Sequence, residues 1–419
     1  MGELKLNQQV NPNESGELST KPLPLKSIRV IDFSRLLPGP WATQLLGELG
    51  ADVIKVEQPG IGDPSRFNYP RYRKNSVYFN VVNGNKRSIA IDLTKPEGRS
   101  VAHRLLKTAD IVFESYRPGV ARKLKVDYDS ARAINPRLIY CSISGFGNSG
   151  PLSKIAGHDL IIQALTGLMG RSLDMQNPPG VPGFQAGDFA GSLIGVIGTI
   201  AALLQRQMTG TGCYIDVSMF DALMYMCPVP LTSALARLAG HSGEPRQEVF
   251  GRNPRYTTYT SKDGKPVAIA LLEAKAWQEF CESIGRPDLI SKNESAADRL
   301  TTHADRRQLY YDVLTEYCAT HTQQEIDKKL HETGIAISPV FTPDQALAAD
   351  NVSAREIISA IEHPEEGRVP HLSNPLARAG LSVAKNGPAP GLGKDSESIL
   401  ASLEYSEAEI ATLRKAQVI

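Results

Sequence analysis

Short β-branched runs alternate with helix-length runs along the first part of the chain. Strands are predicted at the apolar runs SIRVIDF, ADVIKVE, RSIAID, IVFES and RLIYCSIS. The longer segments between them, such as PWATQLLGELG and EGRSVAHRLLKTA, predict helices. Strands separated by helices form βαβ units, which build a parallel sheet with helices on both faces. We therefore expect an α/β fold class with a large Rossmann-like domain.

The pattern becomes helical at about residue 157 and changes again at about residue 256. The most apolar stretch, Phe189 to Leu204, predicts a buried helix over 189–207. This stretch falls short of the roughly 20 residues that a membrane-spanning helix needs. The later run YTTYTSKDGKPVAIALLE predicts a hairpin that turns at Asp263-Gly264, and amphipathic helices follow it. The second part of the chain therefore predicts a smaller α+β domain.

Composition shifts give the expected domain boundaries. Residues 1–25 are polar and predict a disordered N-terminal arm. Residues 26–225 predict the large Rossmann-like domain, which the final segment 345–419 completes. Residues 226–255 contain a stretch rich in Gly, Pro and charge and predict a linker, and residues 256–340 predict the small domain.

Charge and cysteine usage exclude several classes of protein. The 46 basic and 45 acidic residues leave a formal charge of +1 with no Lys/Arg block, so we expect no nucleic-acid partner. The five cysteines are scattered without a C-x-x-C pair, which predicts reduced thiols, a cytoplasmic location and no metal site. The polar N-terminus has no signal-peptide pattern, and we expect no membrane association.

One Gly-rich motif does not support a dinucleotide site. Residues 145–150 read GFGNSG, match G-x-G-x-x-G and follow a predicted strand. A dinucleotide fingerprint needs a helix that opens directly from the glycines and an acidic residue about 20 positions later. Pro151 and a polar loop intervene here instead. We interpret the glycines as a turn that lets another chain segment or a ligand pass close.

Asp188 is the most informative single residue. It lies in the sequence GDFAGS, directly before the most apolar helix. The structural interpretation is an ordinary N-cap whose carboxylate accepts backbone N–H groups. The functional interpretation is that small neighbours leave space beside a carboxylate at a helix N-terminus, where developing anions are stabilised. Such a carboxylate could act as a nucleophile or a base.

Other residues with useful chemistry stand near predicted element ends. His158 is either a surface residue or, if it faces Asp188, half of a pair suited to moving protons near neutral pH. Glu273 ends the apolar run VAIALLE and either solvates the strand end or orients a histidine. Several basic residues fall in predicted loops. Each one alone is interpreted as a surface charge, but together they suit a polyphosphate ligand. These are Arg66, Lys86, Arg87, Arg117 and Lys123.

At these residues the chain resembles the class III CoA-transferase family, which includes formyl-CoA, carnitine and succinyl-CoA transferases and the α-methylacyl-CoA racemases. The resemblance runs from about Ser27 to the C-terminus. The motifs that carry it are IDFSRLLPGPWATQLLGELGADVIKVEQPGIGDPSR, NKRSIAIDL, ESYRPGV, NPRLIYCSISGFGNSGPL, AGDFAGS and TGTGCYIDVSMFDALM. It implies an interlocked homodimer in which each chain has a large Rossmann-like CoA-binding domain and a small domain.

The resemblance also implies a role for Asp188 and a set of CoA contacts. In the transferases the aspartate at the position of Asp188 is the nucleophile, which carries CoA as an aspartyl-CoA thioester. Coenzyme A would arrive as part of an acyl-CoA substrate, a carboxylic acid would be the second substrate, and no cofactor would be bound permanently. The implied CoA contacts are Arg35, Leu36, Leu37, Pro38, Lys86, Tyr116, Arg117 and Lys123.

Racemase chemistry is the alternative that the resemblance leaves open. In the racemases, residues at the positions of His158 and Asp188 are the two bases, and a glutamate at the position of Glu273 supports the histidine. His158 stands where many transferases have an aromatic residue, and the long glycine-rich loop of formyl-CoA transferase is missing, which favours racemisation. The GDPSR loop, the NKRSIAIDL strand and the 419-residue length favour transfer. We favour CoA transfer, with a racemase or a non-catalytic binding subunit as alternatives.

Overall fold

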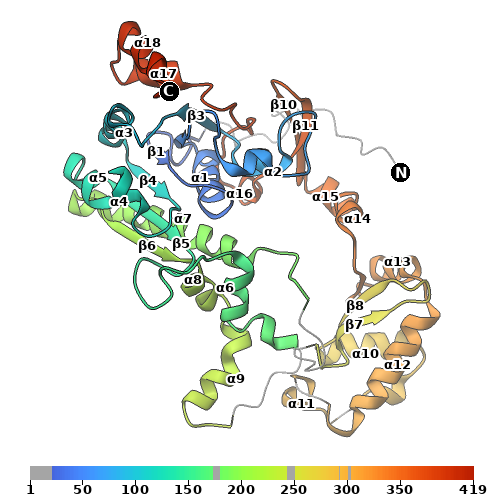
Figure 1. The fold of residues 1–419 in the computed structure, drawn as a ribbon. Helices are drawn as coiled ribbons and strands as arrows, with labels where there is room; N and C mark the ends of the chain where they lie inside the picture. Colours follow the sequence, from blue (N-terminus) through green and yellow to red (C-terminus); the bar gives the residue numbers. More distant parts are fainter. Residues whose placement is uncertain (1–20, 173–179, 243–250, 292, 301–302) are drawn as a thin grey trace. The chain divides into compact units, whose positions relative to one another are not determined.

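The computed structural model describes residues 21–172, 180–242, 251–291, 293–300 and 303–419, which form two compact units (Figure 1). Unit 1 comprises Met1–Thr166, Pro182–Met226 and Ala348–Ile419, and unit 2 comprises Gly167–Val181 and Cys227–Leu347. Each unit has a hydrophobic core of its own.

Unit 1 contains a sheet of six parallel strands in the order β3-β2-β1-β4-β5-β6. The strands are β1 (Arg29–Asp32), β2 (Asp52–Glu57), β3 (Lys86–Ala90), β4 (Ile111–Glu114), β5 (Ile139–Ser144) and β6 (Tyr214–Ser218). This is the doubly wound Rossmann order, in which the direction of winding reverses between β1 and β4. The predicted α/β fold class is confirmed.

Alternate residues of β4 and β5 face two different helix layers. Val112 and Tyr140 share a core with α3 and the C-terminal helices, whereas Phe113 and Cys141 lie against Gly195 of α7. This period of two is the geometry of a pleated strand buried on both faces. The helices of the first part of unit 1 are α1 (Pro38–Glu48), α2 (Val77–Val82), α3 (Pro96–Thr108), α4 (Val120–Leu124), α5 (Tyr128–Ile134), α6 (Asp159–Leu165), α7 (Ala186–Thr209) and α8 (Met219–Met226), with the 3-10 turn η2 (Pro64–Phe67).

The C-terminal segment covers the open edge of the sheet at β3. Ser88 N donates to Asp395 Oδ2 and Ala90 N donates to Ser396 Oγ, so the edge strand does not expose these groups. Ile399 and Leu400 then enter the same core as α3. The elements of this segment are α15 (Asp350–Ala354), the antiparallel hairpin β10 (Ile358–His363) and β11 (Gly367–Leu372), α16 (Pro375–Arg378), α17 (Ser396–Ser402) and α18 (Glu407–Lys415).

The helix α7 is longer than the sequence pattern predicted. It runs over 24 residues, Ala186–Thr209, rather than 189–207. The expectation that this stretch is too short for a membrane therefore does not hold for the whole helix, which is long and apolar enough to span one. Half of its most apolar window is buried in the structure, as is usual for a core helix.

Unit 2 is an α+β body built on an antiparallel sheet in the order β7-β8-β9. The predicted hairpin is confirmed, with Gly264 in its turn at a φ of 75°. Trp277, Phe280 and Tyr310 fill its core. Its elements are η3 (Met169–Ser172), α9 (Pro228–Leu238), β7 (Tyr256–Thr260), β8 (Pro266–Ala270), α10 (Ala274–Ser283), η5 (Pro287–Leu289), α11 (Ala296–Leu300), η6 (Ala304–Arg306), α12 (Arg307–Thr320), α13 (Gln323–Thr333), β9 (Ile337–Pro339) and α14 (Pro343–Leu347).

The structure departs from the sequence predictions at the N-terminal arm and at the linker, and it agrees with them at the glycine-rich turn. Residues 1–20 of the expected arm lie outside the described residues, but Leu25 is buried and its N–H donates to Leu49 O, so the packed chain begins before residue 26. The expected linker 226–255 contains a helix, α9, because LTSALARL has helical spacing of apolar residues. The glycines of GFGNSG do form a turn: a Cβ on Gly145 would lie 2.5 Å from Gly157 Cα, so two chain segments pass there in contact.

Candidate active site

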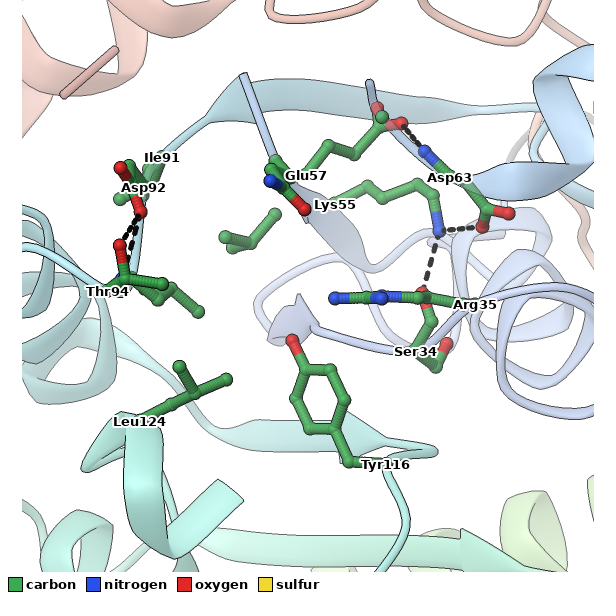
Figure 2. A pocket seen from close by; sticks show the side chains of 14 residues that line it. Ser34, Arg35, Lys55, Glu57, Asp63, Ile91, Asp92, Thr94, Tyr116 and Leu124 are labelled. Carbon is green, nitrogen blue, oxygen red and sulfur yellow. Dashed lines mark hydrogen bonds and ion pairs between the residues drawn. The ribbon is translucent and has the colours of Figure 1, made fainter. Parts of the chain in front are cut away.

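A small cavity lies in unit 1 at the carboxyl ends of β1, β2, β3 and β4, where the winding of the sheet reverses (Figure 2). In open α/β sheets this crevice is where ligands bind. Its volume of about 70 Å³ can hold only one part of a large ligand. Its lining residues are Ser34, Arg35, Lys55, Val56, Glu57, Gln58, Gly62, Asp63, Ile91, Asp92, Leu93, Thr94, Tyr116 and Leu124.

The turn after β1 forms one wall of this cavity. Arg35 N donates to Ser115 Oγ at 2.9 Å, and Leu36 N donates to Asp63 Oδ1 at 3.2 Å. Leu36 has a φ of 64°, a left-handed conformation that costs a residue with a side chain about 1–2 kcal/mol. Strain of this kind persists only where the surroundings hold it in place. Leu37 follows as the buried residue that caps α1.

Two buried ion pairs lie beneath this turn. Lys55 Nζ lies 2.9 Å from Asp63 Oδ2, and Lys86 Nζ lies 3.0 Å from Asp32 Oδ2. Figure 2 shows the Lys55 ammonium between Asp63 and the backbone oxygen of Ser34, to which it donates at 2.9 Å. Burial opposes the ionisation of Asp32, but Lys86 and Lys55 outweigh burial and hold its pKa below the usual range. The four charged groups therefore form one buried network, which contacts the turn through Lys55.

Lys86 does not line the cavity, although the sequence suggested a CoA contact for it. It is the first residue of β3, and its fully buried ammonium also donates to Pro40 O and Asn83 Oδ1 at 2.8 Å each. Burial lowers its pKa to about 8. The neighbouring Arg87 pairs with Asp52 at 2.7 Å. Both cations stand at the amino end of a strand rather than in a loop after one, because the strand begins at Lys86 itself.

The remaining predicted contacts with charged or aromatic side chains either line the cavity or are next in sequence to a residue that lines it. Arg35 and Tyr116 line it, with the Arg35 guanidinium 5.2 Å from the centre of the Tyr116 ring. Arg117 is exposed in the loop that follows, and Lys123 is exposed on α4 next to the lining residue Leu124. Arg66 is engaged in an ion pair with a carboxylate of β2 at 2.6 Å. Arg35, Arg117 and Lys123 therefore present positive charge at or beside the cavity.

Asp188 is not the N-cap of α7, which corrects the structural interpretation. The cap is Gln185, and Asp188 is the third residue of the helix. The Asp159 carboxylate takes the capping role instead: it accepts from Gly187 N at 2.7 Å and from Asp188 N at 3.4 Å. A Cβ on Gly187 would lie 2.9 Å from Ile162 of α6, so the glycine permits this approach. Among the described residues, no hydrogen bond reaches the Asp188 carboxylate, which leaves its oxygens available to a ligand.

The electrostatic setting of Asp188 is unusual for a carboxylate. Burial and the nearby Asp159 raise its pKa to about 7. Tyr78 of α2 lies close enough to Asp188 and Asp63 that burial and these two carboxylates raise its pKa, so its hydroxyl stays protonated at neutral pH. Ser192, one helical turn after Asp188, donates to Pro38 O at 2.6 Å. The start of α7 is thus joined to the turn that walls the cavity.

We expect Asp188→Asn to raise the melting temperature at pH 8 by about 1–3 °C. Asp188 has a higher pKa in the folded chain, about 7, than its ordinary 3.8, so the folded state binds more protons between these values. Stability is therefore lost as the pH rises through this window, and the amide removes that loss. Calorimetry of both proteins from pH 4 to pH 8 checks this. A difference in melting temperature that does not grow with pH would contradict the raised pKa.

The two residues that the racemase alternative adds to Asp188 lie in different units. His158 is exposed and immediately precedes Asp159, which brings it to the end of α6 that meets the start of α7. Glu273 is exposed at the N-terminus of α10 in unit 2. A contact between His158 and Glu273 therefore stays a prediction.

Several residues of the site were missed by sequence reasoning, namely Asp32, Lys55, Asp63, Tyr78 and Asp159. Lys55 did carry a signal, because a charge inside the buried run ADVIKVE must find a partner. Asp159 stood beside His158 but had no spacing that distinguished it. In the parts of the chain that the structure describes, no cluster of three metal-binding side chains occurs.

Comparison with families of known proteins gives one match over most of the chain. Residues 25–396 match the model of CoA-transferase family III. Formyl-CoA:oxalate CoA-transferase of Streptomyces coelicolor is 30% identical over 410 residues, which cover 94% of this chain and 99% of that protein. Succinyl-CoA:glutarate CoA-transferase of Mus musculus is 31% identical over 404 residues, covering 94% and 90%.

Solved structures agree with these sequence matches. A CaiB/BaiF family protein from Brucella suis superposes with a TM-score of 0.77 at 30% identity, over 91% of this chain and 100% of that one. The protein Rv3272 from Mycobacterium tuberculosis superposes with a TM-score of 0.76 at 26% identity, over 90% and 99%. The likeness therefore extends over both units of the chain.

Proposed function

Because the chain belongs to CoA-transferase family III, we propose that it moves CoA from an acyl-CoA donor to a carboxylic acid through a thioester on Asp188. One observation carries the choice of residue. The Asp188 carboxylate, in the first turn of α7, accepts no hydrogen bond from any residue that the structure describes. Ser192 of the same helix donates to Pro38 O, at the end of the turn that walls the cavity. A carboxylate held in this way is open to an incoming thioester.

The proposed reaction consists of four exchanges that each form one bond and break one. A carboxylate oxygen of Asp188 attacks the donor thioester and expels the CoA thiolate, which gives a mixed anhydride. The thiolate then attacks the aspartyl carbonyl, which releases the donor acid and forms the aspartyl-CoA thioester. The acceptor carboxylate displaces the thiolate from Asp188, and the thiolate finally attacks the acceptor's acyl carbonyl. Asp188 is regenerated as a carboxylate, with no net transfer of protons.

Two features of the site suit the charge that develops in these steps. Asp188 stands in the first turn of a 24-residue helix, where the helix dipole stabilises a developing oxyanion. Tyr78 remains protonated near neutral pH and can donate a hydrogen bond there. We assign Tyr78 this role because burial and the nearby Asp188 carboxylate both raise the pKa of its hydroxyl.

The CoA molecule would extend from the cavity to Asp188. The cavity at the carboxyl ends of the strands would hold the adenosine end, with Arg35, Arg117 and Lys123 near the phosphates. The turn Arg35 to Pro38 would carry the thiol arm, because Pro38 O is bonded to Ser192, one turn from Asp188. Tyr116, which also lines the cavity, would pack against the base.

The proposal is tested by the intact mass of the protein after incubation with a panel of acyl-CoA donors. A CoA-sized adduct that peptide mapping assigns to Asp188 is the expected result. No adduct from any donor, together with α-deuterium entering a 2-methylacyl-CoA in heavy water, would replace transfer by the racemase alternative.

A matched substitution separates these two chemistries. We expect His158→Ala to leave adduct formation on Asp188 within about threefold of wild type, because transfer needs one carboxylate nucleophile. The same change in a racemase should lower exchange of the α-proton by about 100-fold or more, the scale of a lost acid–base group. Loss of the adduct in His158→Ala would contradict the assignment of transfer to Asp188 alone.

We further propose that the chain works as a homodimer in the cytoplasm. The outer side of α7 exposes three large apolar side chains that a second chain would cover, Ile197, Leu204 and Met208. The five cysteines, all within the described residues, form no disulfide, which suits a reducing compartment. Light scattering at micromolar concentration tests the dimer, and a monomer would contradict it.

A further inference from the structure

We infer that Lys55 and Asp63 are positioning residues for acyl-CoA binding, because together they hold the turn Ser34 to Leu36 in its binding shape. This inference rests on the proposed function, since it requires that the turn contacts CoA. Both residues border the cavity, but their side chains are only 0% and 1% exposed, so they act on the substrate through the turn.

Asp63 acts on the turn from one side. Its Oδ1 accepts from Leu36 N at 3.2 Å and from Ser65 N at 2.9 Å, while its Oδ2 faces the Lys55 ammonium at 2.9 Å. Leu36 is the residue in the left-handed region, so the turn depends on an acceptor at this place. Burial opposes the ionised form of Asp63, but Lys55 and the hydrogen bonds from Ser65 together outweigh burial and lower the pKa of Asp63. The acceptor is thus a full carboxylate at neutral pH.

Lys55 acts on the turn from the other side. Its ammonium donates to Ser34 O at 2.9 Å and is also 4.0 Å from Asp32 Oδ2. The two ends of the segment Ser34 to Leu36 are therefore fixed by one ion pair: the carbonyl of Ser34 by Lys55, and the N–H of Leu36 by Asp63. Figure 2 shows this pair beside Arg35, which lies between those two tethered residues. A shift of the turn would move Arg35 and the wall of the cavity together.

A second aspartate, at the amino ends of the central strands of the same sheet, offers a control with similar partners. Asp110, directly before β4, accepts from Arg29 N at 2.9 Å and pairs with Arg206 at 2.9 Å. It has the same two kinds of partner as Asp63, a backbone N–H and a cation. An asparagine at either position can satisfy only one of them, because its amide nitrogen donates where the carboxylate accepted. Asp110 is more exposed than Asp63, with 30% of its side chain exposed against 1%. Asp110→Asn therefore removes a carboxylate with the same kinds of partner at a place that does not line the cavity.

The test measures the dissociation constant of CoA by calorimetry for wild type, Asp63→Asn, Lys55→Met, the double variant and Asp110→Asn. We expect each change in the pair to weaken CoA binding about tenfold or more, and Asp110→Asn to weaken it less than twofold. The double variant should bind about as weakly as either single variant, because each change releases the same turn. The double variant removes both buried charges together and leaves neither unpaired. Its affinity for CoA can therefore be measured even if a single variant does not fold.

The outcomes separate this inference from the proposed function. Wild type that does not bind CoA would overturn the proposed function itself. If wild type binds CoA and a folded Asp63→Asn or double variant binds it with the same affinity, the positioning role alone is overturned. Equal weakening by Asp110→Asn would overturn it too, because the loss would then reflect general destabilisation.

Discussion

Asp188→Ala is expected to lower the rate of CoA transfer by about 10³-fold or more, the scale seen when a covalent nucleophile is removed. Within the described ranges of the chain the Asp188 carboxylate has no hydrogen bond to lose, since Asp159 accepts from the N–H groups at the start of α7 in its place. The fold and the cavity that we propose to bind CoA should therefore survive the change. Initial rates with any donor that forms the adduct, measured for both proteins, check this expectation.

Binding of CoA is the control for this substitution. Asp188→Ala should bind CoA within about threefold of wild type, because the cavity and the turn at Arg35 to Pro38 do not include residue 188. Transfer at the wild-type rate in the alanine variant would remove Asp188 from the mechanism. Loss of both binding and transfer would instead indicate that the variant is misfolded, which its melting curve would reveal.

The second large effect is expected from pH. In the proposed mechanism only the ionised Asp188 carboxylate attacks a thioester, and burial with Asp159 raises its pKa to about 7. Formation of the aspartyl-CoA adduct should thus slow by about tenfold for each pH unit below this value and reach a plateau above it. Single-turnover rates between pH 5 and pH 9 measure this profile.

Asp159→Asn tests the cause of the profile. Removing this negative charge should move the midpoint to lower pH, while burial keeps it above the ordinary 3.8 of an aspartate. The asparagine oxygen can still accept from Gly187 N, so the helix start is retained. Asp129→Asn, which changes an exposed carboxylate on α5, is the control and should leave the midpoint in place. A midpoint that does not move in Asp159→Asn would exclude Asp159 as a cause.

Much of the fold could be predicted from the sequence because its signals are local. Short β-branched runs and the helix-length segments between them predicted the parallel sheet, and Asp263-Gly264 predicted the hairpin of unit 2. Boundaries were less accurate: the expected linker contains α9, and α7 extends beyond its apolar stretch at both ends. Polar residues can continue a helix whose apolar face is already buried, so composition alone did not locate its ends.

The sequence by itself determined the α/β class, the two-part organisation, the family resemblance and Asp188 as the residue of interest. Tertiary structure decided which charges serve the site. Lys86 turned out to be buried against Asp32, whereas Asp63 and Asp159, which no spacing had marked, hold the turn at Leu36 and the start of α7. The physical reason is distance along the chain: Asp63 is 27 residues from Leu36, and Asp159 is 28 from Gly187. Periodicity reports only neighbours within a few residues, while a pKa or a buried ion pair depends on groups that folding brings together.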